Sequence, residues 1–232
     1  MASSEACEIV NPVRPMRLPS RRLSGACRNV CGLVAAALLS ACSVTPPRDQ
    51  QDICRVFEQH PHWYDYAVDA EERWGVPAHI LLSFAHFESG FRSNAKPPRD
   101  WFLWIVPLPR PSSAYGYAQA QDPAWREYLE ETGAGWFSDR DNMKDALHFI
   151  GWYNRKSHEE LGISVWDSRN LYLAYHEGRA GYRSGAWRKK PQLIELAERV
   201  DWQAREYGAQ LRQCEDRFKC DSWYQFWPLC RK

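Results

Sequence analysis

Hydrophobic residues recur every three to four positions along several segments of the chain, which is the spacing of one face of an α-helix. The segment 62–74 has this pattern, and Gly75 follows it as a helix stop. A second helix is predicted to start at Pro77 and to run to Glu88. Because this helix is apolar on nearly every side, we expect it to be largely buried. Further helices are predicted at 123–131, 142–156 and 168–177.

The clearest periodic pattern lies near the carboxyl end of the chain. Its hydrophobic residues alternate steps of four and three: Leu193, Ala197, Val200, Ala204, Tyr207, Leu211 and Cys214. The chain shows neither an alternating strand pattern nor an internal repeat, so the predicted class is mainly α. The segment 96–113 contains five prolines and cannot form a long regular helix. Its aromatic residues could stack on sugars, or could pack against the protein or a lipid surface.

The amino-terminal segment has the composition of an export signal. Five arginines precede the apolar run 32–39, and Ser40, Ala41 and Cys42 follow it directly. The run is shorter than the roughly 20 residues that a membrane-spanning helix needs. The string LSAC resembles the lipobox of bacterial lipoproteins, which implies cleavage before Cys42 and lipidation of its sulfur. A plain secretory peptide is the alternative.

The lipobox resemblance divides the chain into three parts. Residues 1–41 are predicted to be the signal peptide, 42–52 the lipidated Cys42 with a polar tether, and 53–232 one folded domain. In enteric lipoproteins, an Asp directly after the lipidated Cys implies retention at the inner membrane. This chain has Ser43 at that position. The resemblance therefore implies a lipoprotein at the periplasmic face of the outer membrane, with inner-membrane anchoring as the alternative.

Composition and charge narrow the possible functions. The 44% hydrophobic content of the 232-residue chain excludes wholesale disorder. Removal of residues 1–41 takes away five Arg and two Glu and lowers the formal charge from +1 to −2, so nothing suggests binding to nucleic acid. The 12 Trp and 11 Tyr suit sugar rings as well as a hydrophobic core.

Four cysteines would remain in the mature chain if Cys42 carries the lipid. An even number in an oxidising compartment predicts disulfides, and three pairings are possible. Because Cys214 ends the hydrophobic stripe of the last helix, we favour its pairing with Cys54, which joins the two ends of the domain. Cys220 would then pair with Cys230. Free or metal-bound thiols are the alternative, although the cysteine spacing does not support zinc.

Glu88 is the carboxyl group that the helical pattern singles out. It follows Phe84 and Leu81 by one and two turns, on the face that we expect to be buried. Removal from water disfavours the ionised carboxylate and raises its pKa, as a general acid near neutral pH requires. The alternative is a terminal Glu that faces solvent or pairs with a cation such as Arg92.

Three ordered motifs identify the family that the chain resembles. The string RWGVPAHILLSFAHFESGFRSNA, at 73–95, resembles the first motif of the lytic transglycosylases of the soluble-lytic-transglycosylase (SLT) type. The string SAYGYAQ, at 113–119, resembles their Ser-x-x-Gly-Leu-Met-Gln segment, and LAYHEG, at 173–178, resembles Ala-Tyr-Asn-x-Gly. The resemblance covers roughly residues 60–185, and such motifs are specific mainly in combination.

The resemblance assigns roles to residues of each motif. It implies that Glu88 is the catalytic acid and base, that Gln119 hydrogen-bonds the substrate, and that Tyr175 holds or polarises the carboxylate of Glu88. The remaining residues that it places at the substrate are Ser89, Tyr117, His176 and Glu177. The chain departs from the pattern at the third motif, where His176 replaces Asn and Glu177 adds a carboxylate.

The resemblance also implies a mainly α, lysozyme-like (goose-type) fold with at most a small β element. The implied reaction cuts the β-1,4 bond between N-acetylmuramic acid (MurNAc) and N-acetylglucosamine (GlcNAc) in peptidoglycan and leaves 1,6-anhydro ends. One carboxyl group would act first as the acid and then as the base. Most glycosidases use two carboxylates, and this reaction would belong to the substrate-assisted exceptions. No cofactor or metal is expected, and we expect a monomer whose partners are glycan strands and, through its anchor, a membrane.

Two other functions stay open on the sequence alone. If Glu177 faces Glu88, it could activate water, and the protein would be a hydrolytic muramidase. Otherwise Glu177 closes its helix or pairs with Arg179. The altered second and third motifs would also fit a peptidoglycan-binding module that has lost turnover.

Replacement of Cys42 by Ala tests the predicted anchor. The variant lacks the sulfur that would carry the lipid, so we expect it to incorporate no labelled fatty acid and to leave the membrane fraction. Labelling and fractionation of expressing cells measure both properties, with Cys31→Ala as the control that keeps the label. A native chain that takes up no fatty acid would contradict the prediction.

Overall fold

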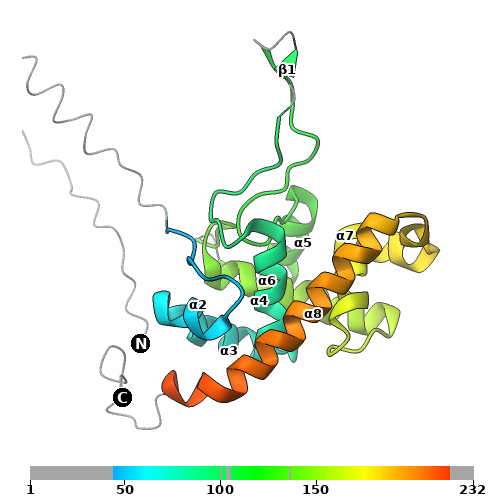
Figure 1. The fold of residues 1–232 in the computed structure, drawn as a ribbon. Helices are drawn as coiled ribbons and strands as arrows, with labels where there is room; N and C mark the ends of the chain where they lie inside the picture. The colour runs from blue at the N-terminus through cyan, green and yellow to red at the C-terminus, as the bar shows by residue number, and fades with distance from the viewer. Residues whose placement is uncertain (1–43, 100, 103–105, 136, 220–232) are drawn as a thin grey trace, which may run out of the picture. The chain divides into compact units, whose positions relative to one another are not determined.

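The computed structural model describes residues 44–99, 101–102, 106–135 and 137–219, which belong to one compact unit (Figure 1). The predicted signal peptide, Cys42, Cys220 and Cys230 lie outside these residues. The elements follow in this order: α2 (Ile53–Gln59), α3 (His62–Trp74), α4 (Ala78–Ser89), β1 (Trp101–Phe102), β2 (Val106–Pro107), α5 (Asp122–Thr132), α6 (Met143–Leu161), α7 (Ser168–Ser184), the 3-10 helix η1 (Ala186–Lys189), α8 (Pro191–Cys214) and the 3-10 helix η2 (Glu215–Arg217). The prediction of a mainly α fold is confirmed.

The helices largely match the periodic segments of the sequence, with differences at their ends. α3 has the predicted bounds, whereas α6 continues five residues and α7 seven residues beyond the predicted ends. The short helix α2 was not predicted, and its start is fixed by Asp52, whose carboxylate accepts hydrogen bonds from the N–H groups of Cys54 and Arg55. Seven residues are too few for a periodic pattern to stand out.

The small β element is a hairpin within the segment 96–113. β1 pairs with β2 in antiparallel register, with Trp101 opposite Pro107 and Phe102 opposite Val106. Each strand has two residues, so no alternating pattern could reveal it. Figure 1 shows β1 beyond the helices, at the far end of this proline-rich segment.

The helix α4 forms the centre of the core. Its Ile80, Leu81, Leu82, Phe84 and Ala85 are all buried, as the apolar composition of the segment predicts. α4 contacts α3, α6 and α8, and Figure 1 shows α8 running across it. The three surrounding helices bury α4 up to Ala85, whereas His86, Phe87 and Glu88 in its last turn keep some exposure.

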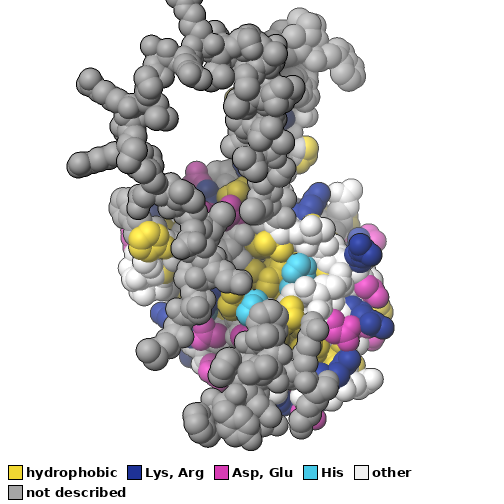
Figure 2. All heavy atoms as spheres, turned by 90° about the vertical axis from the view of Figure 1, so that its left-hand side faces the viewer, with side chains coloured by type: hydrophobic (Ala, Val, Ile, Leu, Met, Phe, Trp, Pro, Cys, Tyr) yellow, Lys and Arg dark blue, Asp and Glu magenta, His cyan; other side chains and the backbone are white. Residues whose placement is uncertain are grey.

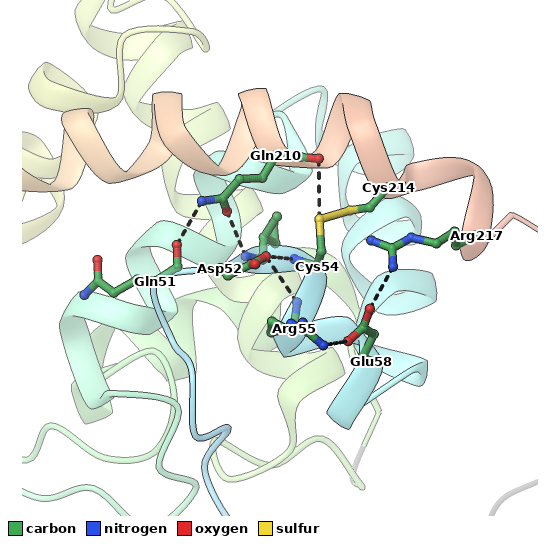
Figure 3. Close-up of a disulfide and its surroundings, with 9 residues drawn as sticks. Gln51, Asp52, Cys54, Arg55, Glu58, Gln210, Cys214 and Arg217 are labelled. Atoms are coloured by element: carbon green, nitrogen blue, oxygen red, sulfur yellow. Dashed lines mark hydrogen bonds and ion pairs between the residues drawn. A yellow bond between two sulfur atoms is a disulfide. The ribbon is translucent and has the colours of Figure 1, made fainter.

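The disulfide between Cys54 and Cys214 joins α2 to the last residue of α8 (Figure 3). This pairing confirms the one that we favoured from the sequence. Gln210 strengthens the junction, because its side chain accepts from the N–H of Ile53 at 2.9 Å and donates to the carbonyl of Gln51 at 3.1 Å. The disulfide therefore closes the domain at its two ends, across 160 residues of sequence.

Charged side chains of both signs are interspersed on the surface. On the face shown in Figure 2, Lys, Arg, Asp and Glu side chains surround a central group of hydrophobic and His side chains. Elsewhere in the described chain as well as here, charged side chains form ion pairs; Arg55 bonds Glu58 at 2.9 Å and Lys144 bonds Asp69 at 2.9 Å. Among the described residues, no helix is both long and apolar enough to cross a membrane.

The double substitution Cys54→Ser with Cys214→Ser tests the contribution of the disulfide. Its loss frees a long loop in the unfolded chain, so we expect the free energy of unfolding to fall by roughly 2–5 kcal/mol. Denaturant unfolding of the native and variant proteins, without reductant, measures the difference. An unchanged midpoint would contradict the prediction.

Candidate active site

Glu88 lies in the last turn of α4, next to the core. The helix ends at Gly90, whose N–H bonds the carbonyl of His86 at 2.8 Å. Phe84, one turn before Glu88, is fully buried and meets the rings of Tyr172 and Tyr175 of α7 edge to face, with centroids 5.2 Å and 5.4 Å away. The apolar turn of α4 and the two tyrosines of α7 thus form the surroundings of Glu88.

Glu88 keeps some exposure as a residue, but its carboxyl group is largely desolvated and is not neutralised by a cation. Burial raises its pKa to about 7, and a hydrogen bond from the Tyr172 hydroxyl opposes this increase. Within the described part of the chain, no ion pair involves Glu88, and Arg92 instead donates to the carbonyl of Ser89 at 2.8 Å. Near neutral pH, Glu88 can therefore be either protonated or ionised.

Two tyrosines of α7 lie beside Glu88, and their hydroxyl groups bond different partners. We expected Tyr175 to hold Glu88, but its hydroxyl donates to the carbonyl of Ala118 at 2.6 Å. The hydroxyl bonded to Glu88 is that of Tyr172. Burial raises the pKa of Tyr175, and the nearby charge of Glu88 adds to this increase. Sequence reasoning missed Tyr172, although it precedes Tyr175 by three residues and so shares its helix face.

The second motif forms a tight turn at the edge of the site. Gly116 has a φ of 77°, and a Cβ there would lie 1.9 Å from the carbonyl oxygen of Arg140. The glycine is therefore required by the close approach of the Arg140 backbone. Gln119 has a φ of 48°, and its amide nitrogen donates to the carbonyls of Ala95 at 3.0 Å and Gly116 at 2.9 Å.

Two residues that the resemblance placed at the substrate are buried. Tyr117 is only 1% exposed and packs against Trp63, and burial raises its pKa to about 12. Ser89 is also 1% exposed, and its hydroxyl donates to the carbonyl of Ala85 at 3.0 Å. Both side chains therefore lie within the core and bond or pack with other groups of the protein.

The other candidate residues surround one pocket of about 250 Å³. Gln119 lies on one side, and Tyr175, His176 and Glu177 of α7 lie on the other. Glu88 is not a lining residue; it lies next to Tyr175, which forms part of the pocket wall. Further lining residues include Gln121, Pro123, Phe149 and Tyr153.

The third motif bends α7 at the pocket. Gly178 has a φ of 76° and a ψ of 154°, which no helical residue adopts, so the helix changes direction there.

The preceding Glu177 has a side chain that is 6% exposed, and its two oxygens lie 2.7 Å and 2.9 Å from Nζ of Lys190. This ion pair lowers the pKa of Glu177. The expected partner, Arg179, pairs instead with Glu127 and Glu160.

The site thus contains two carboxyl groups in opposite environments. Glu88 has a raised pKa and a neutral phenol as its partner, whereas Glu177 has a lowered pKa and a cation. Such a difference separates a proton donor from a group that stays ionised. Across the described ranges, no three His, Cys, Asp or Glu side chains are arranged to hold a metal ion.

Substitution of Glu88 by Gln tests the desolvation of the carboxyl group. The folded protein keeps the proton of Glu88 to a higher pH than the unfolded chain, so stability is lost as the pH rises from 4.5 through about 7. A neutral amide avoids this loss. We expect Glu88→Gln to be more stable than native protein at pH 8, by on the order of 3 kcal/mol, and to lose that advantage at pH 4.

Denaturant unfolding at the two pH values measures the effect. The matched control is Glu72→Gln, which removes an exposed carboxyl from α3 and should give no pH-dependent gain. Equal stability of native protein and Glu88→Gln at pH 8 would mean that the carboxyl is well solvated.

Comparison with known families supports the motif interpretation. The family model described as "Transglycosylase SLT domain" matches residues 30–214. No curated protein matches the chain by sequence. The matched range covers most of the chain and includes all three motifs, and the lysozyme-like helical fold agrees with it. The chain therefore belongs to the transglycosylase SLT domain family, whose general activity is the cleavage of glycosidic bonds in peptidoglycan.

Proposed function

We propose that this protein is a lytic transglycosylase that cleaves the β-1,4 bond between MurNAc and GlcNAc and leaves 1,6-anhydro-MurNAc ends. Glu88 is the acid and the base of this reaction. The observation that carries the proposal is the position of its carboxyl group, which lies desolvated beside the Tyr172 phenol and has no cationic partner among the described residues; this burial raises its pKa to about 7. A group of this pKa can give and take a proton at neutral pH.

The first step is cleavage of the glycosidic bond. Protonated Glu88 donates its proton to the bridging oxygen, and the bond from that oxygen to C1 of MurNAc breaks, with its electron pair leaving on GlcNAc. The 2-acetamido oxygen of MurNAc then forms a bond to C1 and takes up the positive charge as a cyclic oxazolinium ion. Glu88 becomes a carboxylate, which the hydrogen bond from Tyr172 stabilises.

The second step restores the enzyme. The C6 hydroxyl of MurNAc attacks C1, its proton goes to the carboxylate of Glu88, and the bond to the acetamido oxygen breaks. Water is not consumed, so the product is a ring closed between C1 and C6. Burial of Glu88 assists here as well, because a desolvated carboxylate is a stronger base than a solvated one.

The second motif and α7 hold the parts of the site together. The Tyr175 hydroxyl bonds the carbonyl of Ala118, which fixes the turn containing Gln119 against α7. The two hydrogen bonds made by the Gln119 amide nitrogen fix its side chain at the pocket. In the proposed function, Gln119 and His176 contact the sugar, whereas Ser89 and Tyr117 support the site from within the core.

The surroundings of Glu177 favour transglycosylation over hydrolysis. A general base for water needs a carboxylate that can accept a proton. The Lys190 ion pair lowers the pKa of Glu177 and so makes it a weaker base. The raised pKa of Glu88 equally favours an enzyme over a binding module, since glycan binding alone does not require a desolvated acid.

We further propose that the protein works as a monomer at the periplasmic face of the outer membrane, anchored by a lipid on Cys42. The support is the LSAC string with the preceding arginines and apolar run. A lipid at the start of a short tether would keep the domain close to the membrane and within reach of peptidoglycan.

Digestion of purified glycan strands by native protein and by Glu88→Gln tests the proposed reaction. We expect native protein to release products with anhydro ends. We expect Glu88→Gln to be slower by at least about 10²-fold, because it lacks the acid and base. Mass spectrometry distinguishes the products, since an anhydro end is lighter by one water than a reducing end.

Glu177→Gln is the matched control, since it neutralises the other carboxyl at the pocket. It should still form anhydro ends. If native protein releases reducing ends, and Glu177→Gln no longer releases them, the result would support hydrolysis instead. Glycan binding by native protein without any product would support the binding module.

A further inference from the structure

A second pocket, of about 370 Å³, is lined by an excess of positive charge. It lies at the base of the segment 96–113, where that segment leaves and rejoins the helical domain. Its charged lining residues are Lys96, Arg99, Arg110, Arg140 and Asp122.

The only carboxylate among the described lining residues is already paired. Asp122 accepts from Arg140 at 2.8 Å, and the same guanidinium group donates to the carbonyls of Ser113 and Ala120. Arg140 is therefore a structural part of the wall. In the described part of the chain, no ion pair involves Lys96, Arg99 or Arg110. These three cations give the pocket a net positive charge.

The geometry leaves the three cations available to a ligand. Lys96 and Arg99 are exposed, and Arg110 donates one hydrogen bond, from Nε to the carbonyl of Pro97 at 3.1 Å. In the described part of the chain, no hydrogen bond or ion pair uses its terminal nitrogens, which bind carboxylates best in pairs. Lys96 lies over the ring of Tyr115, with Nζ 4.7 Å from the centroid, an arrangement that keeps its charge beside the pocket.

The positive pocket is adjacent to the active-site pocket along the same stretch of chain. Asp122 lies between Gln121 and Pro123, and both of these line the active-site pocket. The hydrogen bond from Arg140 to Ala120 also links the two walls. A glycan strand that reaches beyond Gln121 would pass next to the cations.

We infer that this pocket binds a carboxylate of the peptide stems that branch from the glycan strand. The inference rests on the proposed function, because it takes peptidoglycan as the substrate. Peptide stems carry free carboxylates and lie beside the sugar chain, so the charge and the position of the pocket both match them. The pocket would select strands that still carry stems and would fix their register over Glu88.

The test is the binding of a free stem peptide, without sugars, to the full chain. NMR titration gives the dissociation constant for a peptide with free carboxylates and for the same peptide with amidated carboxylates. We expect the amidated peptide to bind about tenfold more weakly, because each exposed ion pair contributes up to about fivefold. The double variant Arg99→Gln with Arg110→Gln should bind both peptides with the weaker constant.

The matched control is Arg126→Gln, which removes an exposed cation from α5 outside the pocket and should keep the native preference. Equal binding of the two peptides to native protein would overturn the inference, as would a preference that survives in the double variant. Because the peptide contains no glycosidic bond, this result is independent of glycan cleavage. Failure of the proposed function would appear instead as intact strands after digestion.

Discussion

The site depends on the removal of one carboxyl group from water at the end of α4. Burial disfavours the charged form of Glu88 and raises its pKa to about 7. A neighbouring cation would reverse that effect, and the structure instead supplies the neutral hydroxyl of Tyr172. This arrangement lets one residue act first as an acid and then as a base, which a reaction without a second carboxylate requires.

The rest of the fold maintains that desolvation. α4 contacts α3, α6 and α8. In the same turn as Glu88, Nδ1 of His86 lies 3.0 Å from the Tyr207 hydroxyl of α8. The Tyr207 hydroxyl also bonds the carbonyl of Gln50. The Cys54–Cys214 disulfide then joins α2 to the end of α8. Movement of α8 away from α4 would expose the core behind Glu88 to water.

Much of this could be predicted from the sequence because it follows from helical periodicity. The pattern located the buried α4, placed Glu88 at its end and put Cys214 at the end of the stripe on α8, where it meets Cys54. The ordered motifs then gave the family. These features depend on local spacing, which a single sequence displays directly.

The features that the sequence did not reveal depend on contacts between distant segments. Tyr172 is bonded to Glu88 because the tyrosines of α7 pack against Phe84 of α4. Glu177 meets Lys190 where α7 bends at Gly178. Tyr117 belongs to the core because its turn is held by Arg140, 23 positions later. A motif match shows which residues are near the site, but it does not show which of them face it.

The most direct test of this account is the pKa of the Glu88 carboxyl in the folded protein. Carbon NMR of protein labelled at glutamate carboxyl groups, assigned by comparison with Glu88→Gln, would follow its titration. The account predicts a midpoint near 7. A midpoint near the ordinary value of 4.5 would show that Glu88 is solvated, and it would contradict a mechanism in which this one residue is both acid and base.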